Sequence, residues 1–309
     1  MLRSNLRIAF RVFSRNKGFT FINLLGLTLG ITAFLVILTF VYHEFSYDQF
    51  FDEEEEVYRV IQEFKDPEEG MAVSGPALAP VLSQDISAIK SYCRLHRQNS
   101  FISLTKEGTE HVYEEEHLMF ADSTFFEIFD LPLLKGSKTD ALSDPGSVIL
   151  TEKLARKYFG DADPLNQNLE LRGEPLQVKA VMQDLPGKTH LKIDMLVSME
   201  TFKELYNVSQ LGSFWWPAVW TYVKLNPQSD VQAINQQLPE LIKKYREADM
   251  ATNYVPQLQA VRDIHLFSDY YSEIKARANI DMVYLFAFVG MLILLIACIN
   301  YMNLSIVHA

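Results

Sequence analysis

Cysteine is scarce in this chain, which has only Cys93 and Cys298 among its 309 residues. Cys298 lies inside a long apolar run, whereas Cys93 lies in sequence of mixed polarity. We therefore expect the two thiols to be in different compartments, where they cannot bridge each other. A disulfide framework within the chain is excluded.

Charge is missing from both ends of the chain. Residues 1–43 contain no acidic residue, and residues 282–309 contain no Lys, Arg, Asp or Glu. All 39 acidic residues therefore lie in residues 44–281, together with all but five of the 28 basic residues. A segment this acidic excludes nucleic acid as a partner, because phosphates require a basic patch.

The usual catalytic and metal-binding motifs are also missing. The chain has no H-E-x-x-H, no paired C-x-x-C, no EF-hand loop and no G-x-S-x-G. His111 and His117 flank three glutamates, but a spacing of six fits neither a shared helix face nor standard ligand spacing. We expect no catalytic residue, no metal and no cofactor, and the chain is not predicted to be an enzyme.

The segment DLPGKTHL, residues 184–191, resembles the end of a phosphate-binding loop. With Gly187 as the second glycine of G-x-x-x-x-G-K-[ST], the first glycine position holds Met182. Methionine cannot adopt the left-handed turn that glycine allows there. No nucleotide site is expected.

Two long uncharged runs predict transmembrane helices at residues 19–43 and 282–309. Each run exceeds the roughly 20 residues that cross a bilayer in helical form. The alternative is a pair of buried core helices in a soluble protein. The first run is too long for a cleaved signal peptide and is followed by bulky residues. The acidic segment at 44–281 then forms a domain outside the membrane.

Basic residues precede the first run at a helical spacing. Four arginines lie four residues apart and cover one helix face, which predicts an amphipathic helix over residues 1–18 on the inner leaflet. The alternative is that these charges only set topology; either way they hold the N-terminus in the cytoplasm. The residues concerned are Arg3, Arg7, Arg11, Arg15 and Lys17.

Small and polar residues in the two runs predict helix packing. Gly26 and Gly30 lie four apart, a spacing that lets two helix backbones approach closely in lipid. Asn300 and Asn303 lie three apart, and an amide in lipid prefers a partner helix. These features indicate a bundle with more helices than two.

The acidic segment alternates β-like and helix-like stretches, which predicts an α+β domain. Strands are expected where β-branched and aromatic residues gather, at 57–64, 91–97, 147–151, 176–185, 220–225 and 256–264. Helices are expected at 76–86, at 151–160 with a Thr cap and a terminal glycine, and at 230–248, opening on Asp230 and kinked or broken at Pro239.

Three tryptophans in SFWWPAVWTYV suggest a ligand platform. They are Trp215, Trp216 and Trp220. The alternative is ordinary packing in a core or strand.

Several motifs together resemble the MacB/FtsX-like permease subunits of ABC transporters, in the version common in Bacteroidetes. They are NLRIAFRVFSRNKGFTFINLLGLTLGI at the start, YDQF (47–50), VYRV (57–60), FADSTFFEIFDLPLLKG (120–136), VILTEKLARKYFGDADPL (148–165), DLPGKTHLKIDML (184–196), DIHLFS (263–268) and LILLIACINYMNLS (292–305). Thr189 stands where the family usually has serine, and Asn166 where it usually has glycine. Both changes are mild, since the hydroxyl is kept and asparagine tolerates left-handed backbone.

The resemblance implies a periplasmic core domain with a porter-like lobe and an inserted lobe, in the bacterial inner membrane. It implies a separate ABC-type ATPase subunit, a second permease subunit or half, contact with membrane lipid, and a periplasmic adaptor as a further candidate partner. The implied mechanism is mechanotransmission, in which ATP binding shifts the spans and moves the periplasmic domain. The family continues into further spans, so we expect this sequence to be the N-terminal portion of a longer permease.

A membrane-anchored sensor domain, or a regulator of a cell-wall enzyme, is the competing interpretation. Both also place an outer domain between two spans. The substrate is left open, since peptides, lipoproteins, lipids and drugs all fit.

Overall fold

The structure, a computed structural model, describes residues 17–51, 53–64, 70–106, 109–206, 211–245 and 254–306. The chain divides into two compact units. The helical unit comprises residues 1–46 and 278–309, and the central domain comprises residues 47–277.

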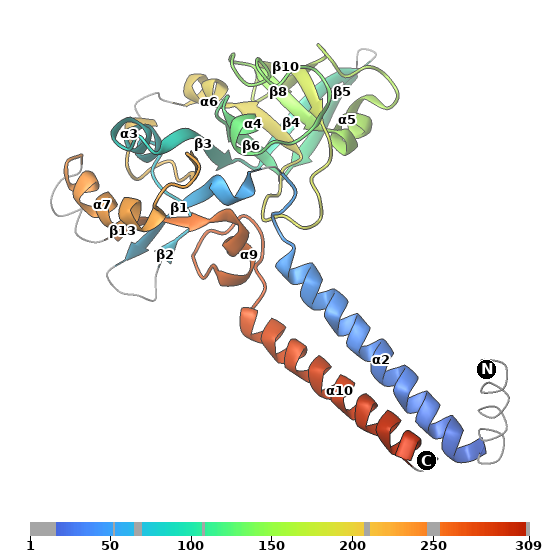
Figure 1. Cartoon of the computed structure of the whole chain (residues 1–309). Helices are drawn as coiled ribbons and strands as arrows, with labels where there is room; N and C mark the ends of the chain where they lie inside the picture. Colours follow the sequence, from blue (N-terminus) through green and yellow to red (C-terminus); the bar gives the residue numbers. More distant parts are fainter. Residues whose placement is uncertain are drawn as a thin grey trace. The chain divides into compact units, whose positions relative to one another are not determined.

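The helical unit contains two long helices that lie side by side, α2 (Lys17–Phe45) and α10 (Ile280–Ile306) (Figure 1). The stretches Phe21–Phe45 and Ile280–Met302 are long and apolar enough to cross a membrane. Their large apolar side chains are mostly exposed, whereas a core helix of a soluble protein would bury them. Exposure of this kind favours lipid as the surrounding solvent.

The central domain is built from short strands and helices. Its strands are β1 (Val57–Phe64), β2 (Gly70–Met71), β3 (Ile89–Arg97), β4 (Ser100–Lys106), β5 (Thr109–Glu115), β6 (Leu118–Ala121), β7 (Leu133–Lys135), β8 (Ser147–Thr151), β9 (Asn168–Leu171), β10 (Glu174–Met182), β11 (Met195–Ser198), β12 (Trp220–Leu225) and β13 (Tyr254–Ala260). Its helices are α3 (Leu78–Asp85), α4 (Phe125–Ile128), α5 (Glu152–Phe159), α6 (Met199–Leu205), α7 (Val231–Lys243) and α9 (Ile264–Phe267), with 3₁₀ turns η1 (Glu54–Glu56) and η3 (Val261–Asp263).

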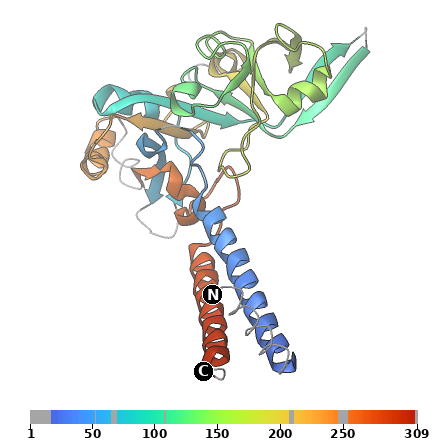
Figure 2. The same ribbon diagram turned by 45° about the vertical axis from the view of Figure 1, so that its right-hand side comes forward.

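These strands join into one mixed sheet in the order β13-β1-β12-β3-β6-β11-β8-β10-β9-β4-β5, with β2 beside β1 and β7 beside β10. The pairs β6–β11 and β8–β10 are parallel. Figure 1 shows β1, β13, α3 and α7 toward one end and β4, β5, β8, β10 and α5 toward the other. Figure 2 shows the β4–β5 hairpin extending from the end opposite β13.

Three apolar clusters form the core. One packs α3 and α7 against β1 and β12 through residues such as Leu78 and Leu238. A second packs α5 and α6 against β8 and β10. The third lies around α4, where Phe129 contacts Tyr222 of β12 edge to face, with ring centroids 5.0 Å apart.

The α+β prediction is confirmed, as are several elements. The strands at 57–64, 147–151 and 220–225 have the predicted bounds. Thr151 caps α5 by accepting from the Leu154 amide at 3.3 Å, and Asp230 caps α7 by accepting from the Ala233 amide at 3.0 Å.

Other elements differ from the prediction. α7 is not broken at Pro239 but continues as one helix, because a single missing donor does not outweigh the burial of Ile234, Leu238 and Ile242 on the same face. The predicted strands at 176–185 and 256–264 were too long: β10 ends at Met182, and β13 gives way to η3 after Ala260.

Candidate functional site

Glycines of α2 lie where it contacts α10. A Cβ added at Gly26 would lie 2.9 Å from Nδ2 of Asn300, and one at Gly30 would lie 2.9 Å from Cβ of Ala297. Both distances are shorter than van der Waals contact. At Gly30 a side chain would meet Cβ of Ala297, which cannot move without its backbone, whereas at Gly26 it would meet the end of the Asn300 side chain, which can shift. The structure therefore brings both glycines together with α10.

Asn300 and Gly290 of α10 also contact α2. Nδ2 of Asn300 donates to the backbone carbonyl of Asn23 at 3.5 Å. A Cβ added at Gly290 would lie 3.0 Å from Cγ2 of Ile37. Asn303 lies in α10, but its side chain is outside the described part of the chain.

The predicted basic helix lies almost wholly outside the described residues. This holds for Arg3, Arg7, Arg11 and Arg15, and Lys17 is described only as the first residue of α2. The amphipathic helix over 1–18 stays a prediction.

The three tryptophans do not form one exposed platform. Trp215 and Trp216 are exposed by 42% and 65%, but Trp220 is only 7% exposed. Trp220 is a core residue because β12 lies inside the sheet, and its Nε1 donates to the Ser272 carbonyl at 2.8 Å. The grouping of all three is therefore corrected.

A buried polar network joins residues far apart in the sequence. Oδ1 of Asp48 accepts from Oγ1 of Thr189 at 2.7 Å and from the backbone N and Nδ1 of His190 at 2.9 and 2.8 Å. Nε2 of His190 lies 2.8 Å from the hydroxyl of Tyr222. Asp48 and Tyr222 are fully buried, and His190 is 4% exposed.

Burial and hydrogen bonding shift the pKa values of Asp48 and Tyr222 in this network. Burial raises the pKa of Asp48, but the attraction of His190 and the hydrogen bonds from His190 and Thr189 outweigh it, so the net pKa is lowered. Burial raises the pKa of Tyr222. His190 thus bridges the two buried groups, with Nδ1 facing the Asp48 carboxylate and Nε2 facing the Tyr222 hydroxyl.

A buried ion pair lies nearby. The guanidinium of Arg59 binds both carboxylate oxygens of Glu273, at 2.6 and 2.8 Å, and Oε1 of Gln259 at 2.6 Å. Nζ of Lys275 donates to the carbonyls of Gly187 and Thr189 at 2.9 and 3.2 Å.

An Asp–His–Tyr chain can serve proton transfer when a substrate reaches it. In this chain its three members are buried among core residues, and their hydrogen-bonding atoms face one another. The arrangement fixes backbone geometry instead. Sequence reasoning missed it, although Asp48 lies in YDQF and His190 in DLPGKTHL, two of the motifs that carry the resemblance.

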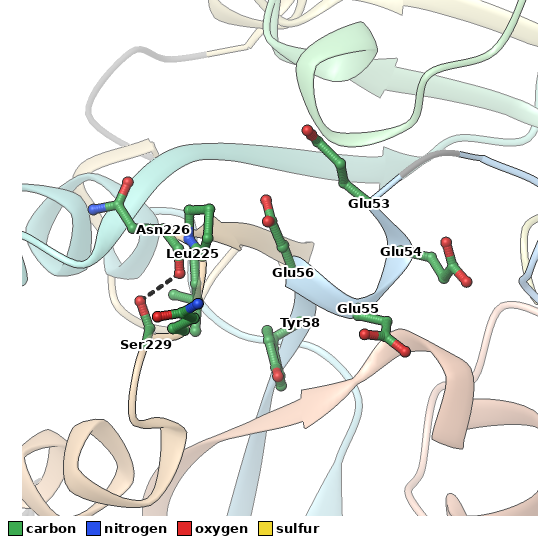
Figure 3. Close-up of a pocket in the computed structure, with 10 residues that line it drawn as sticks. Glu53, Glu54, Glu55, Glu56, Tyr58, Leu225, Asn226 and Ser229 are labelled. Atoms are coloured by element: carbon green, nitrogen blue, oxygen red, sulfur yellow. Dashed lines mark hydrogen bonds between the residues drawn. The ribbon is translucent and has the colours of Figure 1, made fainter.

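The groove of Figure 3 has a volume of about 620 Å³ and is lined by Glu53, Glu54, Glu55, Glu56, Tyr58, Leu225, Asn226, Pro227, Gln228 and Ser229. Its acidic groups do not converge. Glu53 pairs with Lys224 at 2.5 Å, Glu55 pairs with Arg262 at 3.4 Å, and Glu54 and Glu55 point away from the Asn226–Ser229 turn. Among the described residues, no group of three or more His, Cys, Asp or Glu is placed to hold a metal.

Comparisons with solved structures found three domains to which this chain is similar. A domain of a protein described as a permease, from Porphyromonas gingivalis, has a TM-score of 0.59 and 17% identity, covering 76% of this chain and 98% of its own. The periplasmic region of MacB from Actinobacillus actinomycetemcomitans has a TM-score of 0.48 and 14% identity, covering 68% and 90%. The extracellular domain of the noncanonic ABC-type transporter YknZ from Gram-positive bacteria has a TM-score of 0.45 and 15% identity, covering 66% and 99%.

The Porphyromonas domain shows that the fold is shared. None of the curated proteins compared with the chain matches it. The MacB-like periplasmic core domain matches residues 20–241, which is well over half of the chain and includes most of α2. The chain therefore belongs to the family of the MacB-like periplasmic core domain.

Proposed function

We propose that this chain is a permease subunit of an ABC transporter that couples ATP hydrolysis on a separate ATPase subunit to motion of its central domain. The observation that carries the proposal is the family match over residues 20–241, which joins a candidate span to the domain. The coupled motion acts on a substrate for export or extraction. No step of ATP chemistry is assigned to this chain.

The basic residues before α2 favour a cytoplasmic N-terminus, with the central domain in the periplasm. Partners in this arrangement are the ATPase subunit, a second permease subunit or half, membrane lipid and a periplasmic adaptor. The ATPase lies across the membrane from the domain that it moves, so the spans must carry the motion.

The close contact between α2 and α10 supports this role for the spans. The backbones approach at Gly26 and Gly30, and helices packed through glycine can transmit a shift as one body. Leucine at both positions would separate the helices, because Cβ of Ala297 lies opposite Gly30. Gly18 offers a matched control, since a Cβ there would meet no atom of the described residues within 4 Å.

The test uses the permease and its ATPase subunit reconstituted in nanodiscs, with hydrogen exchange of residues 47–277 measured with and without ATP and vanadate. The wild type should show a nucleotide-dependent change in the central domain. Gly26→Leu with Gly30→Leu should abolish that change, and Gly18→Leu should keep it. If hydrogen exchange of the wild-type central domain does not change with nucleotide, the proposed coupling is wrong.

A further inference from the structure

Two short segments connect the central domain to the candidate spans along the chain. The leading segment, residues 47–51, follows α2, which ends at Phe45. The returning segment, residues 268–277, precedes α10, which begins at Ile280. We propose that both segments are tied to one turn, residues 187–190, and that Asp48, His190 and Lys275 are positioning residues that pass motion from the spans to the sheet. This inference rests on the proposed function.

The leading segment is held on the turn by Asp48. Its carboxylate accepts three hydrogen bonds from Thr189 and His190, and its own amide donates to the Lys188 carbonyl at 3.0 Å. Bonds to a buried carboxylate are among the strong ones in proteins. Asp48 also adopts φ of 57°, a left-handed conformation, so the chain bends sharply at this point of attachment.

The returning segment is held on the same turn by Lys275. Its ammonium group donates to the carbonyls of Gly187 and Thr189, which lie on either side of Lys188. Two residues earlier, Glu273 forms its bidentate pair with Arg59 of β1 and also accepts from Ser268. The segment therefore cannot move without moving the turn, β1 or both.

The turn is joined to both halves of the sheet. His190 reaches Tyr222 of β12, which lies between β1 and β3. Downstream the chain continues through buried Leu191 and Ile193 into β11, which lies between β6 and β8. A displacement of the turn would therefore move both β12 and β11.

A purely stabilising role is the competing explanation. Buried polar and ionic groups usually stabilise a fold less than apolar packing of the same volume would. Buried polar and ionic groups instead fix the relative positions of the segments that they join, because hydrogen bonds are directional and apolar contacts are not. The two roles predict different results. If the network transmits motion, its variants should show a smaller nucleotide-dependent change in hydrogen exchange than the wild type, whereas a purely stabilising network would leave that change as it is.

The experiment measures hydrogen exchange at β11 and β12 in the reconstituted complex with its ATPase, with and without ATP and vanadate. Tyr222→Phe removes only the hydroxyl. It should shrink the nucleotide-dependent change at β12 about threefold or more, a size expected for losing one hydrogen bond, and leave the change at β11 intact. Lys275→Met should shrink both changes, and Lys275→Arg should restore them.

Lys192→Met and His111→Gln are matched controls, because both side chains are exposed and lie off the network. Both should behave as the wild type. If Lys275→Met loses protection from hydrogen exchange throughout the central domain without nucleotide, this variant has unfolded and does not report on the inference. The test then depends on Tyr222→Phe, in which the nucleotide-dependent change should shrink at β12 and stay intact at β11.

If Tyr222→Phe and Lys275→Met both show the same nucleotide-dependent change in hydrogen exchange as the wild type at β11 and at β12, the inference is wrong, and the proposed function is unaffected. A wild type with no nucleotide-dependent change anywhere in the central domain would refute the proposed function, and this inference with it.

Discussion

In α2 and α10, leucine, isoleucine and phenylalanine side chains point outward, while in the central domain the same residue types fill three buried clusters. The helical unit has its close contacts at glycines, and the central domain buries complete ion pairs such as Arg59–Glu273. The two units of the chain are therefore stabilised by different interactions.

The difference follows from the solvent. In water, burial of apolar surface drives folding, and about 25 cal/mol is gained per Å² of apolar area. In lipid that force is absent between helices, so they associate through close packing and hydrogen bonds. The comparison therefore indicates that one unit is built for lipid and the other for water.

Breaking the buried ion pair should have the largest effect. Arg59→Met leaves the Glu273 carboxylate, only 12% exposed, without its partner and should destabilise the central domain by about 3–5 kcal/mol. Urea unfolding of the chain in detergent, followed by tryptophan fluorescence, measures this. Arg156→Met is the control, since that guanidinium is 73% exposed and its pair is worth about 1 kcal/mol or less. Equal effects would contradict the account.

Filling the glycine contact should affect the helical unit alone. Gly30→Leu forces a side chain against Ala297 and should weaken the α2–α10 contact by about 1–3 kcal/mol. Cysteines placed at Ile37 and Gly290, in a Cys298→Ala background, should cross-link less in this variant. Gly18→Leu should cross-link normally, and urea unfolding of the central domain should not change in either. A destabilised domain would show that the two units depend on each other.

Acid should act on the central domain through Asp48. The folded-state pKa of Asp48 is lowered, so its ionised form adds stability above the ordinary value of 3.8, and this is lost as pH falls through the folded pKa. The stability gap between wild type and Asp48→Asn should therefore be full near neutral pH and narrow below that value. Urea unfolding at several pH values measures it. A gap that widens on acidification would have the wrong sign.

A smaller effect is expected at a helix cap. Thr151→Ala removes the side-chain acceptor at the start of α5 and should cost about 1 kcal/mol. Thr151→Ser should restore most of it. Helix caps of this kind stabilise helices in water, where the solvent competes for backbone hydrogen bonds. If Thr151→Ala does not change the free energy of unfolding, the contrast between a helical unit built for lipid and a central domain built for water is weakened.

Much of the fold is readable from local pattern. β1, β8 and β12 are rich in β-branched and aromatic residues, and α5 is bounded by Thr151 and Gly160. The sequence prediction lacks β2, β4, β5, β6, β7, β9 and β11. Of these, β6 and β11 have four residues each, all buried, so they show no alternation to detect.

The candidate site was far less accessible to sequence reasoning. Gly26 and Gly30 are an exception, because a spacing of four residues places them on one face of a helix. Asp48 and His190 are 142 residues apart, and no local pattern pairs them. Proximity in sequence suggests that Trp215 and Trp220 act together, but Trp220 lies in a buried strand and Trp215 in the exposed loop before it.

The location of the central domain tests the account most directly. Glu110 is exposed on β5, Cys93 is buried and Cys298 lies in α10, so Glu110→Cys with Cys298→Ala carries one accessible thiol in the central domain. Cells with a permeabilised outer membrane are treated with a membrane-impermeant maleimide. The account predicts labelling while the inner membrane is intact. Labelling only after the inner membrane is broken would place the domain in the cytoplasm and contradict it.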